Sequence, residues 1–276
     1  MKLLTWNVAG RRGALEGQIQ FMADRFPDVV TLQEVTSRTG PRLLELLASQ
    51  AGLEYGQLSI PPSRPKMPPK RSLGVLIASR YPLRGSNVCI ASPWPEKALS
   101  TSVLVPGKPI ELHTVHVPPG SSNGWVKVDV LESVFKAVAR TAPIPRVLTG
   151  DFNAPQAELE DGTIVTWAQR LGTDGHPRER RTIRGGPASR WDAAERNILM
   201  GLGSFGFRDV YRSLHGCRHG GASWVFRTHR GEVHRRFDHV LASEDLLVRS
   251  AEYLVEPVSA RLSDHRPLEV VFGRGI

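Results

Sequence analysis

The sequence predicts an α/β (α+β) fold built on mixed β-sheets with helices beside them. Strand-like apolar runs outnumber amphipathic helical segments, and the helical segments fall between groups of strands, which is typical of mixed sheets. The 276 residues are 40% apolar, which is enough to form a large core. No internal repeat or linker divides the sequence, so we expect a single domain over residues 1–276.

Two strand–helix units open the chain. Lys2–Val8 is a predicted strand with Asn7 at its end, and apolar residues at helical spacing then predict a helix that Pro27 stops. Residues 28–35, DVVTLQEV, are the second predicted strand. Glu34 near its end should face solvent, a cation or a metal, because burying an unpaired carboxylate is costly. Residues 41–52 predict a second helix, with proline near the start and glycine just past the end.

A basic segment and four strands are predicted next. Residues 61–71, PPSRPKMPPKR, hold five prolines and four basic residues without an acid, which predicts an extended loop. Two interpretations of this loop remain, an electrostatic arm for a phosphate backbone or a solvated surface loop. The strands are predicted at Leu73–Ala78, Asn87–Ala91, Thr101–Val105 and Ile110–Val117.

The last of these strands, IELHTVHV, ends at Pro118-Pro119-Gly120. His113 within it is predicted as an ordinary strand residue, whereas His116 directly before the turn is a candidate functional residue. Residues 125–140 then predict an amphipathic helix with Asn123 as its cap. Its apolar stripe is predicted as core.

The stretch Leu148–Pro155, LTGDFNAP, is the most informative segment. Its apolar start predicts a buried strand, and Gly150 and Pro155 bracket a sharp turn at the strand end. Asp151 and Asn153 lie two residues apart, so they share a face if the strand's alternation continues. A carboxylate and a carboxamide held there can handle a water molecule and a phosphate oxygen. Taken alone, the same residues also suit an ordinary turn.

Residues 156–191 are predicted as an insertion or long surface loop, with five arginines between residues 176 and 190. Asp192 and Glu195 then predict a capping box that opens a helix through Leu202. Phe207–Tyr211 leads into a histidine-rich stretch. The remaining predicted strands are Arg235–Ala242 with Asp238 inside it, Ala251–Val255, and a final LEVVF run after Ser263-Asp264-His265-Arg266-Pro267.

The composition of the sequence limits the binding partners and the cellular compartment that we expect. Lys and Arg number 36 against 27 Asp and Glu, so the formal charge is +9 and the pI is about 10.1, which favours polyanionic partners such as nucleic acid or an anionic membrane surface. Two cysteines do not make a disulfide framework. We find no apolar run near the ~20 residues of a membrane span and no signal peptide. We therefore expect a cytoplasmic protein; the oligomeric state stays open.

Several polar residues share one feature, a position at or near a predicted strand end, where sites of α/β proteins are usually built. Oxygen ligands among them can hold a hard divalent cation and still leave a histidine and an aspartate for chemistry. Such a set suits hydrolysis of a phosphate ester. Its members are Asn7, Glu34, Asp151, Asn153, Asp238, Asp264 and His265.

On these motifs the sequence resembles the endonuclease/exonuclease/phosphatase superfamily of metal-dependent phosphodiesterases. The matching pieces follow the family's order and cover almost the whole chain: TWNVAG (5–10), LQEV (32–35), HTVHVPPG (113–120), LTGDFNAP (148–155), RFDHVLAS (236–243) and LSDHRPLEVVF (262–272). The resemblance implies a four-layer sandwich, in which two mixed sheets pack face to face with helices outside.

The resemblance also implies roles. Glu34, with Asn7 close by, would bind Mg²⁺ or Mn²⁺, and Asp264 would lie near the metal. Asp151 would orient or deprotonate the attacking water, and Asn153 would contact the scissile phosphate. His265 would donate to a phosphate oxygen, and Asp238 would keep it cationic, as a nearby carboxylate does. His116 could contact phosphate or assist the leaving group.

The branch within the family stays open. Residues 194–212, AERNILMGLGSFGFRDVYR, resemble a segment of exonuclease III-type apurinic/apyrimidinic endonucleases, and SWVF (223–226) is loosely similar to their aromatic segment. That branch has a tyrosine where His116 stands, and a histidine there is more like deoxyribonuclease I or the sphingomyelinase-type branch. Abasic-site specificity is therefore open.

Four hypotheses follow for function and metal content. The first is a nuclease acting on DNA, with the basic loops at 61–71 and 156–191 binding phosphate backbone. The second is a phosphatase or phosphodiesterase acting on a phosphoinositide, a sphingomyelin-type lipid or another small phosphate ester. The third is an inactive binding module, against which the complete site set argues. A structural zinc site is the fourth, from His215, Cys217, His219, His229 and His234, whose spacing lacks paired ligand signatures.

Overall fold

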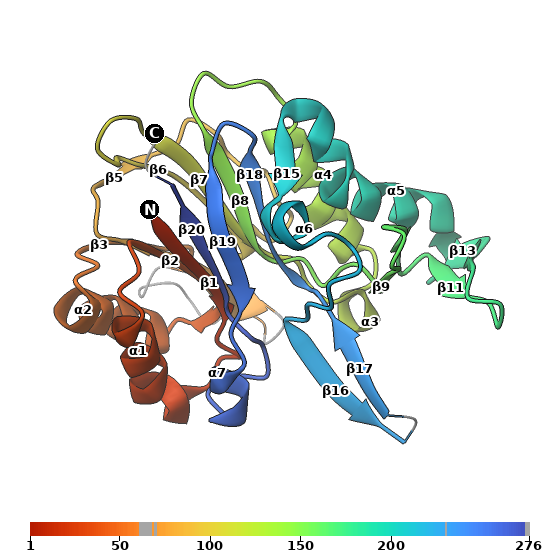
Figure 1. The fold of residues 1–276 in the computed structure, drawn as a ribbon, viewed down its shortest axis with the longest axis horizontal. Helices are drawn as coiled ribbons and strands as arrows, with labels where there is room; N and C mark the ends of the chain where they lie inside the picture. Colours follow the sequence, from red (N-terminus) through yellow and green to blue (C-terminus); the bar gives the residue numbers. More distant parts are fainter. Residues whose placement is uncertain (61–67, 69–70, 230, 274–276) are drawn as a thin grey trace.

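The computed structural model describes residues 1–60, 68, 71–229 and 231–273 (Figure 1). The predicted basic loop at 61–71 therefore lies almost entirely outside the described residues. The predicted two-sheet sandwich is confirmed: two six-stranded mixed sheets pack face to face, and helices cover both outer faces.

The first sheet joins the two ends of the chain. Its strand order is β19-β20-β1-β2-β4-β3, and β1 runs parallel to β2 and antiparallel to β20. The central strands β1, β2 and β4 are buried along nearly their whole length, because both faces of the sheet are covered there. Their bounds are β1 Lys2–Asn7, β2 Val29–Thr36, β3 Tyr55–Leu58, β4 Leu73–Ser79, β19 Val248–Tyr253 and β20 Leu268–Phe272.

The second sheet is formed by the middle of the chain in the order β15-β18-β8-β7-β6-β5, and its one parallel pair is β7 with β8. Strands β7, β8 and β18 are buried along their whole length. The bounds are β5 Leu83–Gly85, β6 Ala98–Val103, β7 Ile110–His116, β8 Arg146–Asp151, β15 Phe207–Asp209 and β18 Asp238–Ser243.

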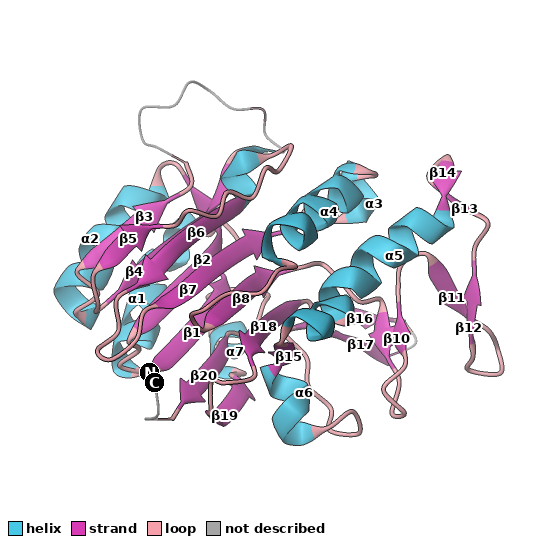
Figure 2. Ribbon diagram, turned by 90° about the horizontal axis from the view of Figure 1, so that it is seen from above, coloured by secondary structure: helices cyan, strands magenta, loops and turns pink. Residues whose placement is uncertain are grey.

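Three apolar clusters hold the four layers together. One fills the space between the sheets and includes Leu3 and Val29 of the first sheet with Leu112 and Val147 of the second. The other two lie between each sheet and its helices. Helices α1 Leu15–Asp24 and α2 Thr39–Ala51 cover the first sheet, and α4 Val126–Val138 and α5 Ala188–Leu199 cover the second (Figure 2). The stripe of the 125–140 helix is core, as predicted.

Shorter elements lie at the ends of the sandwich. The segment that the sequence predicts as a long loop contains three two-stranded ribbons, and a longer hairpin precedes β18. Helices α3 Gly120–Asn123, α6 Val210–His215 and α7 Glu256–Ser259 complete the described helices. The ribbons are β9 Ala157–Glu158 with β10 Ile164–Val165, β11 Gln169–Leu171 with β12 Pro177–Glu179, and β13 Thr182–Ile183 with β14 Gly186–Pro187; the hairpin is β16 Trp224–Thr228 with β17 Gly231–Arg235.

Several sequence predictions of single elements are wrong. Residues 87–91 form no strand, because the hydroxyls of Ser86 and Ser92 accept backbone N–H groups nearby and close local turns. The strand predicted at 101–105 begins and ends earlier, as β6, and the one at 251–255 does so as β19. The sequence patterns also missed β3, β5 and the β16–β17 hairpin.

The predicted helix caps are also wrong, because each capping side chain serves another contact. The Asn123 amide donates back to the Pro119 carbonyl, and α4 begins three residues later. Helix α5 already begins at Ala188; Asp192 accepts from Arg196 one turn later, and Glu195 pairs with Lys127. Asp238 is the first residue of its strand rather than an interior one.

In the part of the chain that the structure describes, we find no helix both long and apolar enough to cross a membrane.

Candidate active site

One edge of the sandwich collects the ends of strands from both sheets. Asn7 ends β1 and Glu34 lies near the end of β2 in the first sheet. His116 ends β7 and Asp151 ends β8 in the second sheet. Asp238 begins β18 directly opposite Asp151 in the antiparallel register. The sequence therefore brings polar side chains from five strands to one place.

The Gly-Asp-Phe-Asn turn depends on a close approach of two strand backbones. Gly150 has φ +133°, and a Cβ built on it would lie 1.9 Å from the backbone oxygen of Val115 in β7. Only glycine fits this position. The absence of a side chain at Gly150 lets β8 lie against β7 where Asp151 leaves the sheet.

Glu34 owes its direction to an irregularity in β2. The pairing of β2 with β4 shifts register between Gln33 and Val35, and Glu34 adopts φ +58° there. A bulge of this kind re-aims a side chain, and a left-handed non-glycine residue stores backbone strain that the surrounding structure must hold. The Glu34 side chain keeps 26% exposure, so it can reach a ligand.

Asn7 joins the two sheets at the site. Its Nδ2 donates to Glu34 Oε1 at 3.2 Å and to Asp151 Oδ2 at 2.9 Å, while its Oδ1 accepts the Ala9 backbone N–H at 2.9 Å. The amide is thereby fixed in one orientation, with both N–H directions used on carboxylates. The predicted proximity of Asn7 and Glu34 is present.

Asp151 is almost completely buried, with 1% of its surface exposed. Burial raises the pKa of Asp151, and the neighbouring Asp238 carboxylate raises it further. His265 and hydrogen bonds from Asn153 and Asn7 oppose these effects, and the resulting pKa is about 7. A carboxylate with a pKa near neutrality suits proton transfer, because a general base works best when its pKa lies near the working pH.

Asp238 and His265 form the hydrogen bond that the sequence predicts. His265 Nδ1 lies 2.7 Å from Asp238 Oδ2. Burial lowers the pKa of His265, but the charge and hydrogen bond of Asp238, together with the charges of Asp151 and Asp264, outweigh burial and raise that pKa to about 10. His265 is therefore an imidazolium at neutral pH, and its Nε2–H remains to donate to an anion.

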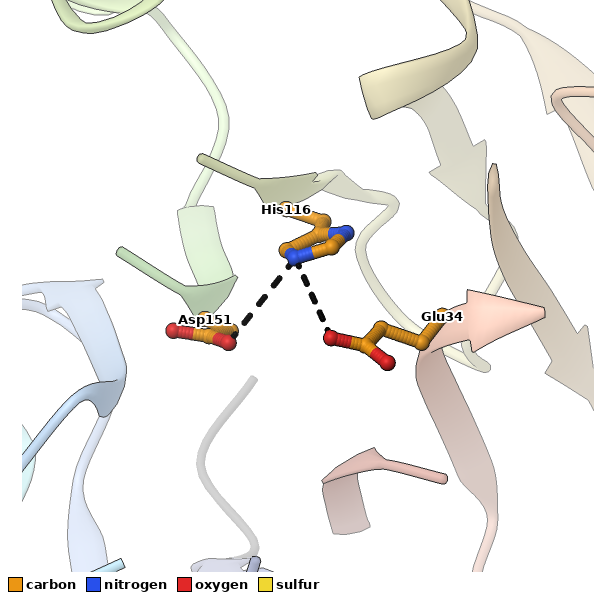
Figure 3. Close-up of side chains that lie close together, drawn as sticks. All are labelled: Glu34, His116 and Asp151. Carbon is orange, nitrogen blue, oxygen red and sulfur yellow. Dashed lines mark ion pairs between the residues drawn. The ribbon is translucent and has the colours of Figure 1, made fainter. Parts of the chain in front are cut away.

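His116 faces Glu34 and Asp151 from the end of β7 (Figure 3). Its Nε2 lies 3.5 Å from Glu34 Oε1 and 4.0 Å from Asp151 Oδ2, and this buried nitrogen has no hydrogen-bond partner among the residues that the structure describes. Burial lowers the pKa of His116 well below its ordinary value, and the charges of Lys97 and His265 lower it further. His116 is therefore neutral.

Lys97 is a buried residue of the site that no sequence pattern singles out. It ends a short 3₁₀ turn, Pro95–Lys97, directly before β6, and its Nζ lies 3.2 Å from His116 Nδ1. Burial lowers the pKa of Lys97 to about 8 against the opposing attraction of Glu34, Glu96 and Asp151. The sequence signal at this position is only Pro-Glu-Lys before a strand, which is common on protein surfaces.

Asn153 is held through both its side chain and its backbone. Its Nδ2 donates to the Val117 carbonyl at 2.9 Å, and its backbone N–H donates to Asp151 Oδ1 at 2.8 Å. The Asn153 carbonyl oxygen accepts from Lys127 Nζ and from Trp167 Nε1, both at 2.9 Å, and Asn153 adopts φ +50°. Lys127 in turn pairs with the buried Glu195 of α5 at 2.5 Å. The helices over the second sheet thus fix the Asn153 loop beside Asp151.

Asp264 lies further from the other carboxylates than its neighbour His265. Its side chain is 52% exposed, lies 3.8 Å from Arg11 Nη2 and accepts from Trp224 Nε1 at 3.4 Å. Within the described residues it does not belong to the two groups of closely spaced donor atoms. Its predicted place near the metal stays a prediction.

The donor atoms fit a divalent cation. One group combines Glu34, His116 and Asp151, the other Asp151, Asp238 and His265, and in each the donor atoms lie within 4.8 Å of one another. Asn7 adds an amide beside the first group. Carboxylate oxygens suit a hard cation such as Mg²⁺ or Mn²⁺. Glu34 is the most accessible of these carboxylates, so it would hold the ion.

A cavity of about 770 Å³ opens beside these residues, and Glu34, Asp151 and His265 form part of its lining. Much of its wall comes from two regions that project from the same end of the sandwich, the ribbons after residue 156 and the β16–β17 hairpin (Figure 2). Residues 119–121 and Trp191 of α5 line it as well. Trp224 stacks on Phe237 with ring centroids 5.5 Å apart, and Arg235 lies over the Trp167 ring at 5.9 Å. Arg180 and Arg184 also line the cavity.

The residues considered for zinc do not converge within the described part of the chain. His215 stacks on His219 and its Nε2 lies 2.8 Å from the Ala251 carbonyl oxygen. Neither group of closely spaced donor atoms contains Cys217 or any of these histidines.

The comparisons with known proteins agree with the fold. The profile of the Endonuclease/Exonuclease/phosphatase family matches residues 4–265. No curated protein matches the chain significantly in sequence.

Similar solved structures cover nearly the whole chain. An AP endonuclease from Archaeoglobus fulgidus has a TM-score of 0.69 at 21% identity, with 99% of both chains covered. D. rerio TDP2 complexed with a single-strand DNA product has a TM-score of 0.65 at 17% identity, covering 99% of this chain and 98% of that one. The 3′ phosphatase NExo from Neisseria, bound to a product DNA hairpin, has a TM-score of 0.64 at 20% identity, with 99% of both chains covered.

Proposed function

Because the chain belongs to the Endonuclease/Exonuclease/phosphatase family, we propose that it is a divalent-metal-dependent nuclease that hydrolyses DNA phosphodiester bonds by activated-water attack. The observation that carries the proposal is the cavity beside Asp151 and His265, which combines aromatic rings with arginines. Nucleobases stack on aromatic side chains, and guanidinium groups bind the phosphates between them. The formal charge of +9 supports a polyanionic substrate.

In the proposed reaction each residue has one task. Asp151, with its pKa of about 7, accepts a proton from the attacking water. Asn7 holds Asp151 and Glu34 in fixed positions, and Asn153 contacts the scissile phosphate. The His265 imidazolium, oriented by Asp238, donates to a phosphate oxygen as negative charge develops. A bound Mg²⁺ or Mn²⁺, held at Glu34, would neutralise phosphate charge.

The test is a cleavage assay with purified protein on supercoiled plasmid, linear duplex, an abasic duplex, single-stranded DNA and RNA. We expect DNA cleavage with Mg²⁺ or Mn²⁺, loss of cleavage with EDTA, and loss in the Asp151→Ala and His265→Ala variants. Undiminished cleavage in EDTA would overturn the metal requirement.

A phosphatase of the same family is the second candidate, because one similar structure is that of a 3′ phosphatase. Release of inorganic phosphate from a 3′-phosphorylated oligonucleotide, a phosphoinositide or a small phosphate ester, without internal cleavage of any nucleic acid, would replace the nuclease proposal. Cleavage of the nucleic-acid strand without release of inorganic phosphate would support the nuclease proposal.

A further inference from the structure

The cluster of Glu34, His116 and Asp151 allows two uses of His116. Its Nε2 can carry a lone pair and ligate the metal, or it can carry a proton and donate to the substrate. Both uses fit the same position, because Nε2 is buried, lacks a hydrogen-bond partner within the described part of the chain and faces both carboxylates at 3.5 and 4.0 Å (Figure 3). The partner of the other ring nitrogen decides between them.

The partner of His116 Nδ1 is the ammonium group of Lys97 at 3.2 Å. Both side chains are buried, with 2% and 3% of the Lys97 and His116 residue surfaces exposed, so water does not compete for this contact. An ammonium group has three donors and no acceptor. Nδ1 must therefore accept, and a neutral ring with an accepting Nδ1 has its proton on Nε2.

This arrangement is the reverse of the one that supports a metal-binding histidine. A ligating histidine donates its second ring N–H to a carboxylate or carbonyl oxygen, which raises the basicity of the ligating nitrogen. Other buried histidines in the described chain have such a partner. His113 contacts Glu111 at 2.8 Å, His265 contacts Asp238 at 2.7 Å, and His239 contacts Asp209 at 3.3 Å. His116 instead meets a cation.

We infer that Lys97 is a positioning residue that holds His116 as the neutral Nε2–H tautomer, so that His116 donates a hydrogen bond to a phosphate oxygen of the substrate instead of binding the metal ion. The inference deepens the proposed function and, for the substrate contact, rests on it. The distances from Nε2 to Glu34 and Asp151 exceed those of a good N–H···O bond. The N–H group is thus available for a third acceptor placed between the two carboxylates.

The electrostatic surroundings agree with this geometry. Glu34, Glu96 and Asp151 favour the charged form of Lys97, whose pKa of about 8 leaves the ammonium as the main form at pH 7. Lys97 and His265 both oppose protonation of His116, so the ring stays neutral. The site would then contain one cationic donor, His265, and one neutral donor, His116.

The tautomer can be measured on the unmodified protein at pH 7 by proton–nitrogen correlation spectra of histidine labelled with ¹⁵N in the ring. We expect His116 to show the Nε2–H pattern, both in metal-free protein and with Mg²⁺ added. A Nδ1–H pattern, or an Nε2 signal that shifts as a ligating nitrogen on adding Mg²⁺, would overturn the inference. Assignment uses His116→Gln, which removes the signal.

Metal affinity gives a second measurement that needs no substrate. Calorimetric titration with Mn²⁺ should give His116→Ala an affinity within about twofold of the unmodified protein. Glu34→Gln, which alters the carboxylate of the same cluster, should lose at least about tenfold, the scale of changes around metal ligands. An equal loss in His116→Ala and Glu34→Gln would show that His116 is a ligand.

Substitution of Lys97 tests its positioning role. Lys97→Met retains much of the volume but lacks the donor, so His116 should show both tautomers, and kcat should fall about 10- to 100-fold, the scale of a lost hydrogen-bond donor. Lys97→Arg retains a charged donor and should recover most of the Nε2–H signal and the activity. An unchanged tautomer in Lys97→Met would refute the role of Lys97.

The proposed nuclease function and the inference about Lys97 can be disproved independently of each other. The spectra and the titrations do not depend on catalysis, so a protein with the Nε2–H tautomer but no activity on any nucleic acid would contradict the proposed nuclease and leave the tautomer assignment in place. An active nuclease with a ligating His116 would contradict only the inference about Lys97.

Discussion

At the scale of single residues, side chains of the same type carry different charges in the site because their surroundings differ. His116 and His265 are both buried, but His116 meets Lys97 and stays neutral, whereas His265 meets Asp238 and is cationic. Two titratable groups driven apart in this way can act as different catalysts within one site. The charge of each ring follows from one hydrogen-bond partner.

Asp151→Asn should lower activity and raise stability. The folded-state pKa of Asp151 lies above its ordinary value, so its charge destabilises the folded protein at any pH above that ordinary value. The amide removes this charge, and kcat should fall on the order of 10³-fold with the general base lost. Urea unfolding in EDTA should show the stability difference growing between pH 4 and 7. A less stable variant at pH 7 would contradict the prediction.

Asp238→Asn should make activity sensitive to pH near neutrality. His265 has a raised pKa of about 10, so the stability and charge that it gains from Asp238 are present at low pH and lost only as the pH rises through that value. Without the carboxylate, burial alone lowers the pKa of His265. The ratio of unmodified to variant kcat should increase from pH 6 to pH 8, to about 10- to 100-fold. A constant ratio would mean that Asp238 does not keep His265 charged.

At the scale of elements, the site depends on how closely β7 and β8 approach. Gly150→Ala would place a methyl group 1.9 Å from the Val115 carbonyl oxygen at a φ that side chains rarely adopt. We expect a loss of on the order of 3 kcal/mol in the free energy of unfolding, together with loss of activity. Gly203→Ala is the control, because an added Cβ there meets no atom within 4 Å, and it should stay within about 0.5 kcal/mol. Equal effects of the two variants would contradict this account.

The ribbons after residue 156 should contribute to nucleic-acid binding through the arginines that line the cavity. Arg180→Ala should weaken single-stranded DNA binding and reduce the slope of log K against log salt by about 0.7, the value for one contact to a single strand. Arg178→Ala is the matched control: Arg178 lies two residues away in the same ribbon segment and pairs with Asp174 at 2.9 Å. Fluorescence anisotropy over a salt series measures both. Equal slopes would exclude Arg180 from the interface.

At the scale of the whole molecule, the sandwich and most of its site could be predicted because the information is local. Short apolar runs mark strands buried on both faces, and motifs such as GDFN and SDHRP mark their ends. Lys97 could not be predicted, since its role comes from β6 pairing with β7, which places it beside His116. The Asp192 and Glu195 side chains matched a helix cap in sequence, but Asp192 accepts from Arg196 one turn on in the same helix and Glu195 makes a tertiary contact with Lys127.

The division of the site between two sheets has a consequence for how the protein acquires activity. Asn7 and Glu34 come from the first sheet, whereas His116, Asp151 and Asp238 come from the second, and the Asn7 amide bonds across the junction. Neither sheet alone holds the complete set of site residues. During refolding, catalysis can return only when the two halves dock in register, so enzymatic recovery reports this docking step and should lag behind the return of helical circular dichroism.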